Sequence, residues 1–212
     1  MTKQFRVLYK VTIIILAILA AMLIGSVILL TIGADVFKTY MVILFEPLKT
    51  TLQLTEVLIR AIPLTIIALG ISVAYRSGII NIGGEGQMAM GILGTTAVAL
   101  AFPELPKPIL LPMAILAGAM AGGVWGFIPG ILKAKLQVSE LLSTVMLNYI
   151  AAQLYTFMLR GPFLDPAELT MGSGTPQSMR LSRGIWLDRF LKGTRLHTGI
   201  FFALLLALLI FF

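Results

Sequence analysis

Three polar side chains interrupt an apolar, glycine-dense stretch at residues 77–94, and their types suit the binding of a polar solute. Asn81, Glu85 and Gln87 together offer amide donors, amide acceptors and one carboxylate. A carboxylate is costly to place in hydrocarbon, so we expect it to face protein, water or a ligand. We therefore interpret this stretch as the functional core of a membrane transporter.

Two backbone conformations are compatible with the stretch. In a helix that continues from residue 76, Ser77, Asn81 and Glu85 form one polar stripe, and Glu85 lies about 13 Å deep, near the membrane midplane. If the glycines, chiefly Gly83 and Gly84, break the helix, exposed backbone groups become a second source of hydrogen bonds to a ligand. In either conformation the polar groups can face a pathway, and in the second they can instead hold the break in shape.

A second polar face is expected in the span over residues 138–158. Glu140, Thr144 and Asn148 recur at helical spacing, with Glu140 about 8 Å deep if the interface lies at Lys135. Two spans then each offer one acid and one asparagine to a common interior. The alternative interpretation is that these groups hydrogen-bond helix to helix, which contributes only about 1 kcal/mol for each contact.

The composition places the chain in a membrane and excludes several kinds of chemistry. Of its 212 residues, 58% are hydrophobic and 12% are charged, whereas soluble domains carry about 25% charged residues. The net charge of +7 fits basic anchors at span ends, so no nucleic acid is needed to explain it. There is no cysteine and only one histidine, His197, and we expect neither a metal site nor catalytic residues.

The apolar runs predict an all-α, polytopic transmembrane bundle with five complete spans and the start of a sixth. The first follows a basic N-terminus, which indicates a retained span with the N-terminus inside. The third contains the glycine-rich stretch and is expected to be broken there. The basic segment 161–197 is expected to be a loop on the extracytoplasmic side by counting spans. The predicted spans are residues 11–32, 52–75, 78–102, 109–132, 138–158 and 200–212.

Two further patterns concern packing and chain length. Glycines recur at every fourth position on the fourth predicted span, and such a row of small residues allows two helices to approach closely in lipid. These are Gly118, Gly122, Gly126 and Gly130.

The final apolar run holds thirteen residues, too few to cross a hydrocarbon core of about 30 Å. We therefore expect residues 1–212 to form a single transmembrane domain that is a C-terminally truncated fragment of a longer protein.

Two strings carry a resemblance to a known family. They are Asn81-Ile82-Gly83-Gly84-Glu85-Gly86-Gln87 and the segment 140–149, which ends in Met-Leu-Asn-Tyr. In these strings the chain resembles the permease subunits of bacterial ABC importers in the branched-chain amino acid and simple-sugar class. It is most similar to the branch that imports nucleosides with binding lipoproteins of the basic-membrane-protein type. The resemblance covers residues 55–166.

The resemblance implies a division of labour among several proteins. Two permease subunits would enclose a pathway across the cytoplasmic membrane, an extracytoplasmic lipoprotein would deliver the substrate, and two ATPase subunits would bind ATP and magnesium. The chain has no P-loop, which fits a transport subunit that is not an enzyme. The family's ATPase-contact segment is expected after residue 212. Two alternatives stay open: an ABC permease for monosaccharides, and an ion-coupled secondary transporter that uses Glu85 and Glu140 as protonation sites.

Overall fold

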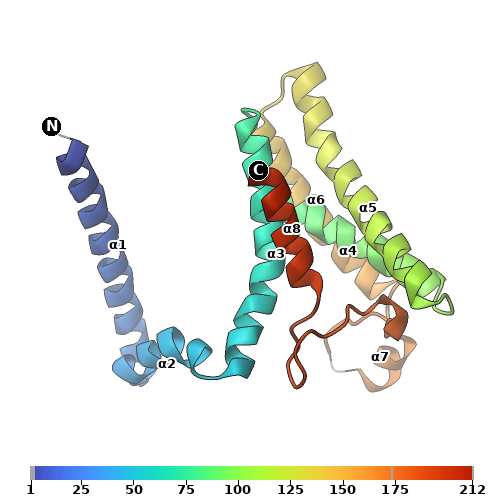
Figure 1. Cartoon of the computed structure of the whole chain (residues 1–212), viewed down its shortest axis with the longest axis horizontal. Coiled ribbons are helices and arrows are strands. Elements are labelled where there is room, and N and C mark those ends of the chain that lie inside the picture. Colours follow the sequence, from blue (N-terminus) through green and yellow to red (C-terminus); the bar gives the residue numbers. More distant parts are fainter. Residues whose placement is uncertain (1–2, 173, 212) are drawn as a thin grey trace. The chain divides into compact units, whose positions relative to one another are not determined.

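The computed structural model describes residues 3–172 and 174–211, and its regular structure is helical throughout this part of the chain (Figure 1). Four helices are long and apolar enough to cross a membrane. The prediction of an all-α, polytopic membrane bundle is therefore confirmed. Ser173, in the predicted 161–197 loop, and Phe212, at the end of the predicted sixth span, lie outside the described residues. The helices in chain order are α1 (Lys3–Thr31), α2 (Val36–Lys49), α3 (Thr51–Arg76), α4 (Gly84–Ala101), α5 (Lys107–Leu136), α6 (Glu140–Arg160), α7 (Pro166–Met171), the 3-10 helix η1 (Arg183–Ile185) and α8 (Gly199–Phe211).

The chain divides into two compact units, Met1–Leu58 and Ile59–Phe212. In the first unit, α1 carries a 24-residue apolar stretch that is hydrophobic all round, as expected of a helix in contact with lipid. A turn joins it to α2, where the Asp35 carboxylate accepts a hydrogen bond from the Lys38 N–H at 2.9 Å and caps the helix. The Tyr40 hydroxyl ties the two helices together by donating to the Met22 carbonyl at 2.6 Å.

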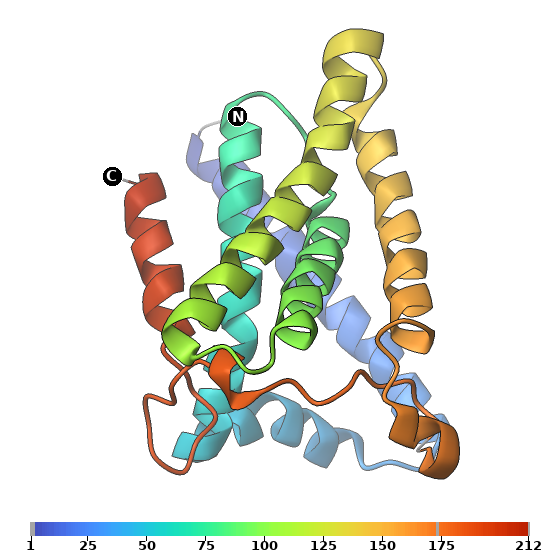
Figure 2. The ribbon, with the colours of Figure 1, turned by 90° about the vertical axis from the view of Figure 1, so that its right-hand side faces the viewer.

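The second unit is built around α4, which packs mainly on α5 and also contacts α6 (Figure 2). Two glycines of α5 lie directly against α4. A methyl group on Gly118 would collide with the Thr95 hydroxyl, and one on Gly122 would lie 2.9 Å from the Gln87 carbonyl oxygen. Two helices approach this closely only where the side chains between them are small. Gly130, the last of the predicted row, faces open space.

A small apolar core joins α3 to α8. Ile62 of α3, Ala203 of α8 and Leu196 of the preceding loop are buried, and Ile66 and Ile200 pack against them. The Arg76 guanidinium, in the last turn of α3, donates to the Ile210 carbonyl at 3.1 Å. The predicted start of a sixth span therefore corresponds to a helix packed along α3.

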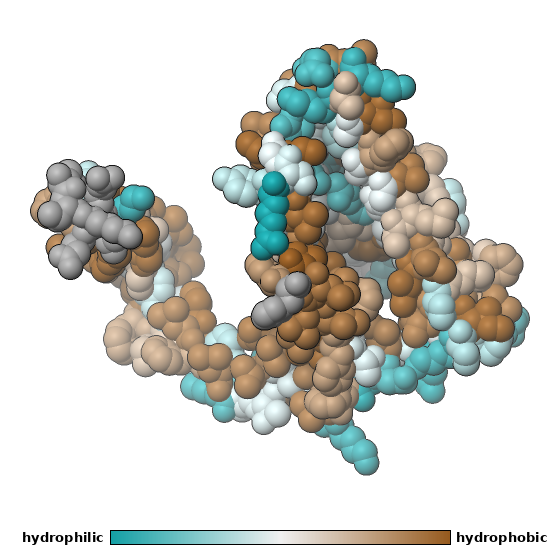
Figure 3. Space-filling model, turned by 45° about the horizontal axis from the view of Figure 1, so that its top comes forward, coloured by the Kyte–Doolittle hydropathy of each residue, from teal (hydrophilic) through white to brown (hydrophobic). Residues whose placement is uncertain are grey.

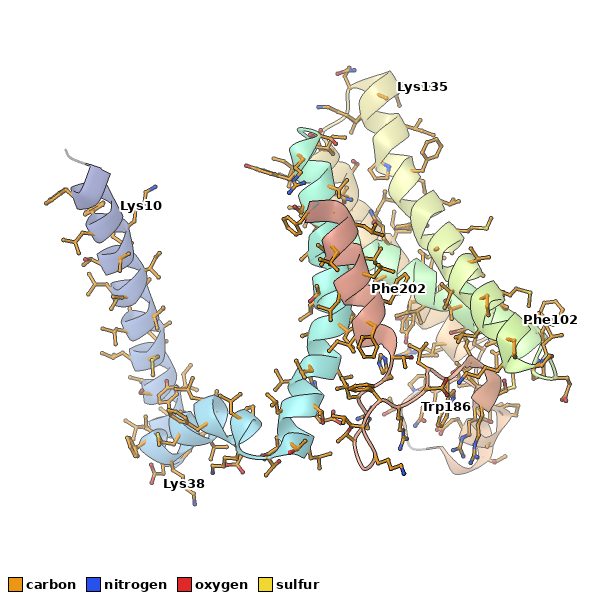
Figure 4. The ribbon with its side chains drawn as sticks, in the orientation of Figure 1. Lys10, Lys38, Phe102, Lys135, Trp186 and Phe202 are labelled. Atoms are coloured by element: carbon orange, nitrogen blue, oxygen red, sulfur yellow. The ribbon has the colours of Figure 1, made fainter. Side chains whose placement is uncertain are left out.

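Polar residues gather at the two ends of the second unit, while the flanks of its helices are hydrophobic (Figure 3). Lys135 marks one end, and Phe102 and Trp186 mark the other (Figure 4). The segment 161–197 lies at the end marked by Trp186, where η1 packs on α5 and Asp188 forms an ion pair with Lys107. This segment and the α5–α6 turn thus occupy opposite ends of the bundle.

Candidate functional site

The helix that we predicted over residues 78–102 begins later than expected. After α3 ends at Arg76, residues 77–83 are not helical, and the chain turns at Gly78 with a φ of +76°. Helix α4 starts at Gly84, so Ser77 and Asn81 form no helical stripe with Glu85, and the depth derived from a continuous helix does not apply. The structure has the broken conformation, in which backbone groups are exposed at a helix start.

Asn81 shapes the break from within. Its Oδ1 accepts a hydrogen bond from the Gly83 N–H at 2.8 Å, which closes a turn over two residues. Gly83 is the N-cap residue of α4 and has no side chain that could accept from the first turn. The unpaired N–H groups of this helix start must therefore find acceptors elsewhere in the molecule.

Asn148 on α6 supplies one such acceptor. Its Oδ1 accepts from the Gly86 N–H at 2.9 Å, and its Nδ2 donates to the Ile82 carbonyl at 3.0 Å. One amide therefore satisfies a donor inside α4 and an acceptor in the segment before it. Asn148 acts as an N-cap supplied by a different helix and holds the two sides of the break together.

Gly86 makes this contact sterically feasible. A Cβ atom at position 86 would lie 2.8 Å from Asn148 Oδ1, 3.2 Å from Asn148 Cα and 3.1 Å from the indole nitrogen of Trp125. The indole N–H is buried and has no hydrogen-bond partner among the described residues. Sequence reasoning missed both the close approach of Gly86 to Asn148 and the position of Trp125 beside Gly86. The available signal was a tryptophan next to Gly126 in the glycine row.

The two acids do not share an interior as predicted. Glu140 is the first residue of α6, and its carboxylate pairs with Lys133 at 2.9 Å across the α5–α6 turn. Residues 137–139 are not helical, so the depth of Glu140 derived from a continuous helix does not apply. Glu85 is exposed in the first turn of α4, where a negative charge is favoured by the helix dipole. It lines a cavity of about 490 Å³ whose lining does not include Glu140.

Thr144 lies beside the break, and its hydroxyl is used within the protein. It is buried, and its hydroxyl donates to the Glu140 carbonyl one turn earlier at 2.8 Å. A methyl group on Gly83 would come within 3.3 Å of the Thr144 Cβ. Thr144 and Asn148 therefore form the α6 wall of the break.

A larger cavity of about 660 Å³ lies among α3, α4 and α5, beside the 490 Å³ cavity, and both are lined by Asn81, Gly84 and Met88. Its wall is mostly apolar, with a few amide and hydroxyl side chains along α4 and at the break. This composition is typical of small-molecule sites, which occupy about 300–1,000 Å³ and orient the ligand with few polar groups. The polar side chains that line it are Asn81, Gln87, Thr95 and Thr96, and the remaining lining comes from residues of α3, α4 and α5 together with Leu181.

Comparisons with known proteins show that the chain is similar to permease components of membrane transport systems. Residues 53–212 match the family described as "Branched-chain amino acid transport system / permease component". The glucose ABC transporter permease protein TsgB13 of Haloferax volcanii is 38% identical over 79% of this chain and 43% of its own length. The guanosine ABC transporter permease protein NupP of Bacillus subtilis is 33% identical, over 93% of this chain and 56% of its own length.

A third relative is the nucleoside ABC transporter permease protein NupB of Lactococcus lactis, which is 32% identical over 92% of this chain and 55% of its own length. The chain thus spans about half the length of the curated relatives it matches. No solved structure matches the chain.

Proposed function

The chain belongs to the family of branched-chain amino acid transport system permease components, and we propose that it is a permease subunit of an ABC importer for nucleosides or related small hydroxylated solutes. The role is that of a transport subunit rather than an enzyme. In this proposal the break at residues 77–83 and the cavity beside it belong to the substrate pathway.

The single observation that carries the proposal is the 660 Å³ cavity against the broken helix. It is large enough for a drug-sized solute, and its few polar groups lie along α4 and at the break before it. Broken helices with exposed backbone groups are where many membrane transporters hold their substrates. Two nucleoside or guanosine permeases among the relatives support a nucleoside as the solute.

The proposal includes partners that the chain itself does not contain. ATPase subunits would bind ATP and magnesium, a second permease subunit would complete the pathway, and an extracytoplasmic lipoprotein would deliver the substrate. We place the N-terminus inside the cell and the segment 161–197 outside. That segment lies at the end of the second unit opposite to Lys135, in keeping with this orientation.

A monosaccharide is the second candidate substrate, and one observation favours it. The relative with 38% identity is a glucose permease, and the amide and hydroxyl groups of the cavity would also suit a sugar. The cavity wall argues for the nucleoside, because apolar side chains outnumber polar ones there and a nucleobase offers them a flat apolar face.

Uptake measurements test the proposal directly. The complete transporter, with its ATPase and binding lipoprotein, should accumulate radiolabelled guanosine in cells, and accumulation should stop when ATP is depleted. It should persist when a protonophore collapses the proton gradient while ATP stays high. Uptake that followed the proton gradient instead would support the ion-coupled alternative based on Glu85 and Glu140. Uptake of glucose without guanosine would overturn the nucleoside assignment.

A further inference from the structure

We propose that the side-chain amide of Gln87 recognises the nucleobase of a solute in the cavity among α3, α4 and α5. This inference rests on the proposed function and assigns a specificity-determining residue within it. Gln87 lies on α4, one turn after the helix start, and its side chain lines the 660 Å³ cavity. It is close in sequence to the break, yet its side chain makes no hydrogen bond to the break.

The hydrogen bonds of the two amides near the break distinguish their roles. Asn148 uses both its oxygen and its nitrogen on the backbone of the break. Gln87 makes only a backbone hydrogen bond, from its N–H to the Gly83 carbonyl at 3.0 Å. Within residues 3–172 and 174–211, no protein group pairs with the Gln87 amide, so its donors and its acceptor remain available to a ligand. A polar group without a protein partner in an apolar wall is costly unless water or a ligand satisfies it.

Glycines hold the amide in a defined place. A Cβ atom on Gly126 of α5 would lie 2.9 Å from Gln87 Nε2 and 3.0 Å from Gln87 Cδ, and one on Gly83 would lie 3.4 Å from Nε2. The amide therefore occupies a slot between the helix start and α5, and a side chain at position 126 would displace it. A side chain that is already confined loses less conformational entropy when it binds a ligand.

The walls around the amide suit a flat, largely apolar group. Ile67 from α3, Met88 from α4 and Ile115 from α5 line the same cavity. The Thr95 hydroxyl, further along α4, is engaged with the Ala114 carbonyl at 3.2 Å. Protein sites recognise a nucleobase by packing apolar side chains on its faces and by hydrogen-bonding its edge.

The chemistry of the amide matches nucleobases as a class. Each common base carries a neighbouring donor and acceptor on its Watson–Crick edge, and a glutamine amide offers the complementary pair. Rotation about the last side-chain bond reverses the order of donor and acceptor, so one glutamine can pair with purines and pyrimidines. A hexose carries hydroxyl groups around the whole rim of its ring and offers these apolar walls only small patches of C–H groups. The site is therefore expected to take nucleosides in preference to sugars.

Competition between guanosine and 1-methylguanosine tests the inference, because the methyl group removes the ring N–H donor from the base edge. In the complete transporter, guanosine should be taken up about 10- to 100-fold more efficiently than the methylated analogue. The variant Gln87→Met should lose most of this preference, so that the two nucleosides differ by less than about twofold. The matched control Gln153→Met replaces an exposed amide on α6 and should keep the wild-type ratio.

A second variant keeps the inference testable if Gln87→Met does not insert into the membrane. Insertion is measured as the amount of the variant protein in isolated membranes. Gln87→Glu keeps the shape of the side chain but can only accept, so it should shift the preference from adenosine towards guanosine, whose edge carries two neighbouring donors, by about tenfold. A wild type that carries guanosine, with ratios unchanged in both variants, would overturn the role of Gln87 alone. A wild type that carries glucose but no nucleoside would overturn the proposed function, and this inference with it.

Discussion

The two faces of the α4 start use the same chemical group in opposite ways. On the α6 face, the Asn148 amide is fully paired with the backbone of the break at 2.9 and 3.0 Å. On the face towards α3 and α5, the Gln87 amide has no protein partner in the described part of the chain and lines a cavity. Both residues are amides in apolar helices, and hydropathy alone does not distinguish them.

The comparison shows how a polar residue in a membrane protein can be assigned to structure or to ligand binding. A buried polar group needs a partner, and the protein supplies it where the group serves the fold. Where the protein supplies none and a cavity adjoins the group, a ligand or water is expected to do so. By this criterion Asn148 holds the break, and Gln87 is the group that we propose for contact with the solute.

The largest effect is expected on the Asn148 face from Gly86→Val. The first carbon of the new side chain would meet Asn148 Oδ1 at 2.8 Å and the Asn148 backbone at 3.2 Å, so α4 and α6 would have to separate. Overpacking of this kind costs about 1–3 kcal/mol and sometimes more. We expect little protein in the membrane and no uptake. Immunoblotting of membranes and guanosine uptake measure both, with Gly123→Val, whose position is open, as the control.

Asn148→Leu should have the next largest effect, because it leaves the Gly86 N–H and the Ile82 carbonyl without their partner. An unsatisfied buried group costs about 1–3 kcal/mol, although polar contacts in membranes average nearer 0.6 kcal/mol. We expect a lower melting temperature in detergent and a loss of uptake that is the same for guanosine and 1-methylguanosine. If the loss were confined to one nucleoside, Asn148 would belong to the ligand face, and the contrast with Gln87 would be wrong.

Gly126→Ala should act on the Gln87 face with little effect on stability. The added methyl group would lie 2.9 Å from Gln87 Nε2 and displace the amide from its slot. We expect normal protein levels and a guanosine preference reduced by about threefold to tenfold, since part of a bidentate hydrogen-bond pair is lost. Gly130→Ala is the matched control on the same helix, because its added methyl group meets nothing within 4 Å. Equal ratios in the two variants would show that the slot does not position the amide.

The smallest effect is expected from Glu140→Gln, which removes the ion pair with Lys133 at the α5–α6 turn. The Lys133 end of this pair is exposed, and ion pairs near the protein surface contribute little. The Glu140 carboxylate is partly buried and also interacts with the Ile80 backbone in the break, but glutamine keeps a side-chain oxygen that can accept there. Guanosine uptake should therefore change by less than about twofold. A complete loss of uptake in this variant, together with wild-type uptake that depends on the proton gradient, would support the ion-coupled alternative.

Hydropathy and charge were sufficient to locate most of the helices. Predicted spans at residues 52–75, 109–132 and 138–158 correspond to α3, α5 and α6 within a few residues, because the thickness of the hydrocarbon core sets their length. The start of α4 was placed six residues too early. Gly78 ends α3 in the left-handed conformation that glycine favours. The residues after it do not mark where the next helix begins, and the group that stabilises the actual start, Asn148, lies on another helix.

The candidate site was predictable only as a set of residue types. Asn81, Gln87 and Asn148 were all named from the sequence, but their roles depend on which hydrogen bonds the folded protein makes. The two acids were treated as equivalent, yet one pairs with a lysine at a helix turn and the other is exposed beside the break. Spacing along one chain does not contain this information, because it depends on which helices become neighbours.

The cap that α6 supplies to α4 also bears on how the chain is made. The Gly86 N–H and Asn148 are 62 residues apart in sequence. At a synthesis rate of about 5–20 residues per second, Asn148 leaves the ribosome roughly 3–12 s after Gly86. During that interval the start of α4 lacks its acceptor, and hydrocarbon offers none. The native hydrogen bonds of the break therefore cannot form when α4 first enters the membrane. Until α6 has been inserted, the membrane insertion machinery or nearby water must supply hydrogen-bond partners for the start of α4.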